Sequence, residues 1–107
     1  MKKLLIANWK MHKNLKECEE FSLDFLQKYT SKREAWIAPQ ALHIDHLLKA
    51  FEKSNVKIGA QNCSDQLEGA FTGEISPRSL KELGAEFVII GHSERRQIFK
   101  ESSSFLN

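Results

Sequence analysis

Four short apolar runs alternate along the chain with segments whose apolar residues recur every three or four positions. The runs are LLIA (Leu4–Ala7), AWIA (Ala35–Ala38), VKIGA (Val56–Ala60) and EFVII (Glu86–Ile90). Each run has the length of a strand and leads into polar or glycine-containing sequence, which predicts a strand. The first and last runs do not alternate with polar residues, so we expect both of their faces to be buried.

Amphipathic helices are predicted in the gaps between these strands. The first begins at Asn14, which can form a capping box with Glu17. A short third helix begins at Ser76, with Pro77 in its first turn and Gly84 after its end. The apolar positions are Leu15, Cys18, Phe21, Phe25 and Leu26 in the first helix, and Leu42, Leu47, Leu48 and Phe51 in the second, which is expected to end within 53–55.

The spacing of these elements is typical of an α/β protein. Strand predictions begin about 20 to 30 residues apart with a helix in each gap, which indicates βαβ units with right-handed crossovers and therefore a parallel sheet. At 107 residues the chain is one domain or part of one. No linker divides it.

Charge and composition exclude several classes of protein. The net charge of +2 is small, and the basic residues are spread among acidic ones, which argues against nucleic-acid binding. No apolar run approaches the roughly 20 residues that span a bilayer, so we expect a soluble protein without a membrane partner. The two cysteines form no CxxC pair and no signal peptide is evident, which favours a reduced, cytoplasmic setting.

Polar residues with useful chemistry follow the apolar runs directly. Asn8 and Lys10 come after the first run, Gln61 and Asn62 after the third, and His92 after the fourth. Ligands of parallel α/β proteins bind beyond the carboxyl ends of the strands, where side chains from several strands converge. An ammonium group, an amide and an imidazole that donates a hydrogen bond would together form a site for an oxyanion.

These residues also have plainer interpretations. A lysine just past a strand is usually a solvated charge, and a histidine there often makes only a structural hydrogen bond. His92 has a further property if Ser93 begins a helix. The N–H groups at the start of a helix disfavour imidazolium and would lower the pKa of His92, so we expect the ring to act as a neutral donor.

Other kinds of site find less support. His43 and His46 lie three residues apart on a predicted helix, but no third ligand is evident, and we expect no metal site. The chain has neither a phosphate loop with its lysine nor a GxGxxG turn. Neither Cys18 nor Cys63 has a neighbouring base in the sequence, so nucleophilic catalysis is not predicted.

The least regular segment is residues 61–74, which contains EGAFTGE. A loop of that length inside a compact domain usually has a function. We expect it to project outward, so that its apolar Phe71 needs a partner surface.

Four short motifs occur in the order and at the spacing of one known family. They are ANWKM after the first run, GAQN at the third, GAFTGEIS in the following loop and GHSERR after the fourth. In these motifs the chain resembles the triosephosphate isomerase family, from Leu4 to about Phe105. The resemblance implies a TIM (β/α)8 barrel, of which residues 1–107 would be a single region covering about the first four parallel βα units.

The resemblance also implies an activity. Members of this family interconvert dihydroxyacetone phosphate and D-glyceraldehyde 3-phosphate through an enediolate, without a cofactor, in glycolysis and gluconeogenesis. Asn8 and Lys10 would contact the substrate, with Lys10 stabilising charge in the transition state. His92 would polarise the carbonyl group and shuttle protons between the two oxygens, with Ser93 and Glu94 just behind it.

The expected partners follow from the same resemblance. The substrate would be a small phosphorylated triose. The loop that contains Phe71, Thr72 and Gly73 would reach into a second copy of the protein, which implies a homodimer. One departure lies beside the site, because His12 stands where the family commonly has asparagine.

Length sets a limit on these expectations. A (β/α)8 barrel takes about 250 residues, and the family's glutamate base, closing lid and later phosphate-binding loops belong to its second half. Residues 1–107 alone are therefore expected to be inactive. The alternative is a non-catalytic half-barrel α/β interaction module that assembles through its strand edges. An open, doubly wound sheet of flavodoxin type is a third possibility, although no phosphate-binding first loop supports it.

Overall fold

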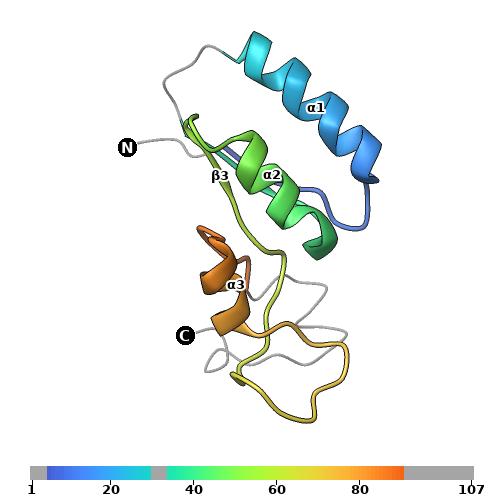
Figure 1. Ribbon diagram of the computed structural model, residues 1–107, viewed down its shortest axis with the longest axis vertical. Coiled ribbons are helices and arrows are strands. Elements are labelled where there is room, and N and C mark those ends of the chain that lie inside the picture. Colours follow the sequence, from blue (N-terminus) through green and yellow to red (C-terminus); the bar gives the residue numbers. More distant parts are fainter. Residues whose placement is uncertain (1–4, 30–33, 91–107) are drawn as a thin grey trace.

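The fold is a parallel sheet with helices packed against it, in a computed structural model that describes residues 5–29 and 34–90. Along the chain its elements are β1 (Leu5–Asn8), α1 (Leu15–Lys28), β2 (Ala35–Ala38), a 3₁₀ helix η1 (Ala41–His43), α2 (Ile44–Ala50), β3 (Val56–Ile58) and α3 (Pro77–Leu83). The sheet has the order β1-β2-β3, and both pairings are parallel. Helix α1 packs beside α2, which covers the sheet (Figure 1). The predicted α/β class is confirmed.

The register of the sheet separates its side chains into two faces. Ala7, Ile37 and Ile58 lie side by side across the three strands. Because successive side chains of a strand point to opposite faces, these residues share one face, and Ile6, Trp36 and Lys57 share the other. Ile37 and Ile58 are 2% and 0% exposed, whereas Ile6 is 50% exposed. Within residues 5–29 and 34–90, the helices therefore cover only one face of the sheet.

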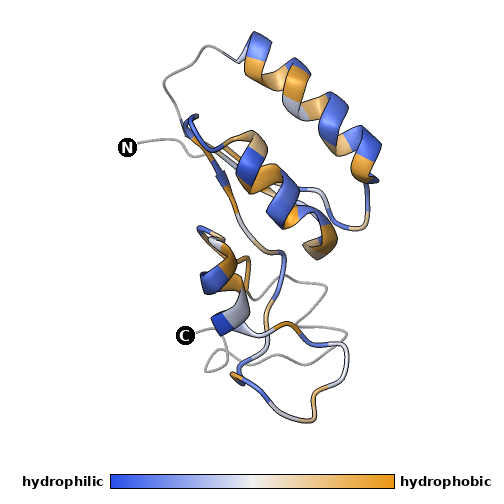
Figure 2. Cartoon of the chain, viewed as in Figure 1, coloured by the Kyte–Doolittle hydropathy of each residue, from blue (hydrophilic) through white to orange (hydrophobic). Residues whose placement is uncertain are grey.

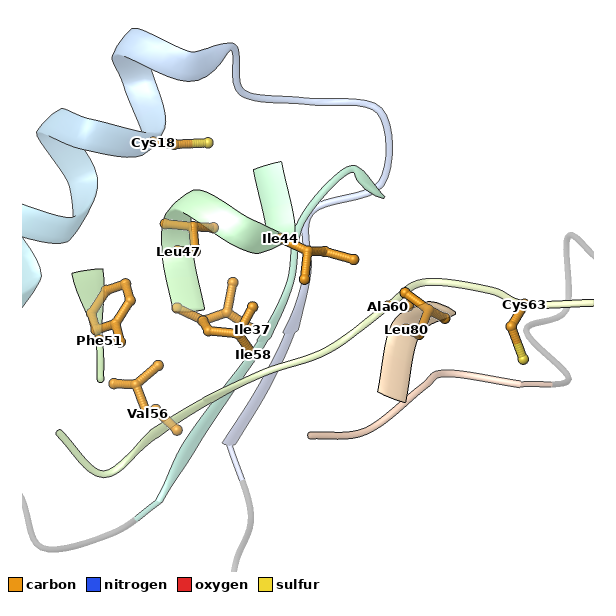
Figure 3. Packing of buried hydrophobic residues seen from close by; sticks show 11 residues of the cluster. Cys18, Ile37, Ile44, Leu47, Phe51, Val56, Ile58, Ala60, Cys63 and Leu80 are labelled. Carbon is orange, nitrogen blue, oxygen red and sulfur yellow. The ribbon is translucent and has the colours of Figure 1, made fainter. Parts of the chain in front are cut away.

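The core lies between that face and the helices. Figure 3 shows Ile37 and Ile58 beneath Leu47 of α2, with Cys18 reaching in from α1. A second part of the same cluster gathers around α3, where Leu80 packs near Ala60 and Cys63. Burying a large aliphatic side chain contributes about 1.5 to 3 kcal/mol, so these few residues account for much of the stability of the fold.

Local signals in the sequence fix the helix ends. Asn14 Oδ1 accepts a hydrogen bond from the backbone N–H of Glu17 at 2.9 Å, and Glu17 Oε1 accepts one from the N–H of Asn14 at 3.1 Å. The predicted capping box is thus confirmed. Ser76 caps α3 at its first turn, and Gly84 ends that helix with a φ of 105°, a conformation that glycine adopts without strain.

The apolar faces of the helices are narrower than predicted. Leu15 and Leu26 are 48% and 44% exposed, because α1 contacts the rest of the described chain mainly through Cys18, Phe21 and Phe25. Leu42 is 86% exposed, because it lies in η1 rather than on the buried face of α2. Helix α2 also ends earlier than expected, at Ala50. Figure 2 shows that hydrophobic and hydrophilic residues are mixed along α1.

The expectation that the first strand is buried on both faces was wrong. Leu5 is 51% exposed and Ile6 is 50% exposed, because β1 is the edge strand of the sheet and the described chain does not cover its second face. An apolar run identifies a strand, but it does not show whether other parts of the same chain pack against both faces of that strand.

The fourth apolar run lies beside β3, as expected for a parallel sheet, but it forms only a short pairing. Ala60 and Val88 make a single parallel bridge. The N–H of Ala60 donates to the Phe87 carbonyl at 2.9 Å, and the N–H of Ile89 donates to the Ala60 carbonyl at 2.8 Å. Strand β3 itself ends at Ile58, two residues before its predicted end. The last described residue of the fourth run, Ile90, is 38% exposed, so its predicted burial on both faces was also wrong.

No helix in the described ranges is long and apolar enough to span a bilayer.

The close approach of β3 to the fourth run depends on Gly59. A Cβ atom at this position would overlap the carbonyl oxygen of Phe87 and lie 2.6 Å from the Phe87 ring. We predict that Gly59→Ala pushes this run away from β3 and destabilises the chain by about 1 to 3 kcal/mol. Hydrogen exchange of the Ala60 and Ile89 amides should accelerate. The Trp9 amide, which donates to the Ala38 carbonyl at the end of β2, serves as an internal control. Equal protection in the variant and the parent chain would contradict this close packing.

Candidate active site at the carboxyl ends of the strands

Two of the predicted site residues lie at the carboxyl end of β1. Asn8 is the last residue of that strand, and Lys10 follows two positions later on an exposed turn. His92, Ser93 and Glu94 lie outside the described residues, so their place in the site stays a prediction. The run before them is parallel to β3 as far as it is described, and hence points toward the same end of the sheet.

The turn that carries Lys10 has an unusual backbone. Lys10 has a φ of 53°, which is uncommon for a residue with a side chain. The N–H of His12 donates to the Trp9 carbonyl at 3.1 Å and closes the turn. On the amino side, Asn8 Oδ1 accepts a hydrogen bond from the Lys10 N–H at 2.9 Å. The amide predicted to touch a ligand therefore also shapes the backbone of the neighbouring lysine.

Gln61, three positions after the end of β3, holds the other side of this turn. Gln61 Nε2 donates to the carbonyl oxygen of Lys10 at 2.7 Å and to that of Ala38 at 3.0 Å. The Ala38 oxygen also accepts a hydrogen bond from the N–H of Trp9 at 2.9 Å. Gln61 was a candidate from its position after the third run, and the structure brings it into contact with the Lys10 turn.

A second glutamine, which the sequence did not single out, holds the rest of the loop. Gln40 Nε2 lies 3.3 Å from the carbonyl oxygen of His12 and 3.2 Å from that of Lys13, which has a φ of 76°. In the sequence, the role of Gln40 could have been suspected from its position two residues after β2. The loop from β1 to α1 passes near the start of α2 in Figure 1.

An aromatic contact fixes the loop onto α1. The indole ring of Trp9 meets the ring of Phe21 edge to face, with centroids 4.9 Å apart. Lys13 Nζ lies 5.7 Å from the centroid of the same indole, within the range of a cation–π interaction. His12, the departure from the resembled family, is exposed, and its carbonyl takes part in the Gln40 contact.

This arrangement suits the binding of a small anion. Lys10 brings a positive charge to the end of the sheet at which three strands converge, on a turn fixed by hydrogen bonds from both sides. Charged groups held in advance at one position stabilise an anion without the cost of reorganising. Burial raises the pKa of the Cys18 thiol, although Lys13 opposes this effect, so Cys18 is not an activated nucleophile.

The described part of the chain contains no group of three or more histidine, cysteine or acidic side chains that could hold a metal ion. His43 is in η1 and His46 is in α2, and within the described ranges neither belongs to such a group.

The loop before α3 is exposed at its tip and closed at its base. Phe71 is 47% exposed, and Thr72 and Gly73 are exposed beside it. The N–H of Ser64 donates to the Ile75 carbonyl at 2.7 Å and closes the base of the loop. The projection of this loop is confirmed, whereas its cover by a second copy stays a prediction.

The comparison with known proteins decides the family. The family model of triosephosphate isomerase matches residues 3–107. The chain belongs to the triosephosphate isomerase family. It is 46% identical over 109 residues to the triosephosphate isomerase of Aquifex aeolicus, covering 100% of this chain and 44% of the relative. It is 44% identical over 108 residues to that of Thermodesulfovibrio yellowstonii, covering 99% of this chain and 44% of the relative.

A third triosephosphate isomerase, from Fusobacterium nucleatum, is 46% identical over 110 residues, covering 100% of this chain and again 44% of the relative. The chain thus spans less than half the length of the curated relatives it matches. Its parallel strands and packed helices fit the first part of a (β/α)8 barrel, and Asn8 and Lys10 lie at the end of that barrel's first strand.

The hydrogen bond between Asn8 and the Lys10 amide can be tested directly. We predict that Asn8→Leu, which keeps the size of the side chain but removes the acceptor, destabilises the 107-residue chain by about 1 kcal/mol. Asn8→Asp keeps an acceptor oxygen in the same place and should change stability by less than about 0.5 kcal/mol. Urea denaturation measures both, and equal losses in the two variants would show that this acceptor does not support the turn.

Proposed function

We propose that the protein carrying this chain interconverts dihydroxyacetone phosphate and D-glyceraldehyde 3-phosphate in the cytoplasm, as a step of glycolysis and gluconeogenesis. The observation that carries this proposal is the fixed turn at Lys10, in a chain that matches the family from residue 3 to residue 107. The three relatives are triosephosphate isomerases, which supports the same activity.

The proposed reaction moves one proton between adjacent carbons. A carboxylate base takes a proton from the carbon beside the carbonyl group, and the electrons of the broken C–H bond form an enediolate. Returning the proton to the other carbon gives the isomer, so no oxidant or reductant is needed. His92 donates a hydrogen bond to the carbonyl oxygen and passes protons between the two oxygens, and Lys10 stabilises the negative charge on them.

Asn8 contributes to substrate binding at the same strand end, and Ser93 and Glu94 support His92 from behind. The base is proposed to come from outside residues 1–107, so these residues alone are expected to be inactive. The loop that includes Phe71, Thr72 and Gly73 is proposed to pack on a second copy in a homodimer, which would cover the exposed Phe71 ring.

A second candidate function is a non-catalytic module that assembles through strand edges. One observation favours it, namely that β1 is an edge strand whose Leu5 and Ile6 are half exposed. The two functions predict different behaviour when residues 1–107 are joined to the second part of a barrel.

The test is a hybrid in which residues 1–107 replace the matching segment of the Aquifex aeolicus triosephosphate isomerase. We predict that the hybrid isomerises both triose phosphates in a coupled assay, and that the 107-residue chain alone does not. Lys10→Ala should lower kcat/KM on the order of a hundredfold or more, because it removes a charge that stabilises the transition state.

Lys16→Ala is the matched control, because it removes an exposed lysine on α1 without touching the strand ends. A folded hybrid without activity, or equal activities in the two lysine variants, would overturn the proposed function. A second hybrid built on the Fusobacterium nucleatum relative separates an unsuitable junction from an inactive site. Assembly of the chain alone into defined oligomers, together with inactive hybrids, would favour the interaction module.

A further inference from the structure

Lys10 has both of its backbone polar groups held by side chains. Its N–H donates to Asn8 Oδ1, and its carbonyl oxygen accepts from Gln61 Nε2 at 2.7 Å. Its φ of 53° lies in a region that lysine rarely adopts. A residue in such a conformation persists only where its surroundings hold it there, and such residues gather at functional sites.

Of the two residues that contact the Lys10 backbone, Gln61 is the more distant in the sequence. Asn8 is only two residues from Lys10, whereas Gln61 is 51 residues away. Its amide nitrogen reaches both the Lys10 carbonyl and the Ala38 carbonyl, and the latter oxygen belongs to the last residue of β2. The Lys10 turn is therefore held at a set distance from the sheet itself.

From this geometry we infer that Gln61 is a positioning residue for Lys10. It fixes the backbone from which the Lys10 ammonium reaches the phosphorylated substrate. The inference rests on the proposed isomerase function. A glutamine suits the task, because its NH₂ group offers two donors from one nitrogen, one for each carbonyl oxygen. Glutamate would place negative charge against the same oxygens, and methionine would fill the space without a donor.

The kinetic test uses Gln61→Met in the active hybrid. We expect kcat/KM to fall about ten- to a hundredfold, mainly through kcat, because a shift of about 1 Å in a catalytic group can cost that much. Gln27→Met is the matched control, since Gln27 is an exposed residue near the carboxyl end of α1 and lies outside the loops that follow the strands. That control should leave kcat/KM unchanged.

A double-mutant cycle separates positioning from general damage to the fold. If Gln61 acts through Lys10, Gln61→Met should have less than a twofold effect in the Lys10→Ala background. A full ten- to hundredfold loss in that background would show that Gln61 supports the structure rather than Lys10, and would overturn the inference.

A second measurement does not depend on activity. In the 107-residue chain labelled with ¹³C-lysine, the Cα and Cβ chemical shifts of Lys10 report its positive φ. We expect Gln61→Met to move these shifts toward ordinary values, while Gln27→Met leaves them unchanged. Unchanged Lys10 shifts in Gln61→Met would overturn the inference even if the isomerase function holds. Shifts that move as expected in the chain, with inactive hybrids, would mean that the proposed function fails while Gln61 still sets the turn.

Discussion

The carbonyl oxygen of Ala38 joins the ends of three strands. As the last residue of β2, Ala38 is 0% exposed, and its oxygen accepts one hydrogen bond from the backbone of Trp9 and another from the side chain of Gln61. Trp9 follows β1 and Gln61 follows β3, so one acceptor sets the relative positions of both loops. The register of the sheet places this oxygen, and the positions of Asn8 and Lys10 depend on it.

The second face of the sheet is organised although the described chain leaves it without a helix. The rings of Trp36 and Phe87 stack with centroids 4.8 Å apart, and Lys57 Nζ lies 3.2 Å from Glu86 Oε2. Glu86 Oε1 also accepts a hydrogen bond from the backbone N–H of Ile58. These contacts hold the start of the fourth run against β2 and β3.

The features that the sequence predicted correctly have local causes. The capping box at Asn14 and the α3 ends at Ser76 and Gly84 depend on residues a few positions apart. The contacts of Gln40 cross 27 and 28 residues, and no local pattern shows which carbonyls a glutamine will meet. The sequence also did not indicate the positive φ of Lys10, because lysine is not a residue type that favours this conformation. Exposure of β1 depends on what covers the sheet, which an apolar run does not encode.

The sheet has one further consequence, for the way in which the chain folds. Its order β1-β2-β3, followed by the bridge to Val88, repeats the order of the elements in the sequence. Each strand pairs with the one made just before it, so a nascent chain leaving the ribosome always has the required partner already exposed. The amino-terminal part of a chain emerges first during synthesis, and this topology would let the sheet grow one strand at a time. No strand among the described residues has to wait for a distant part of the chain before it can pair.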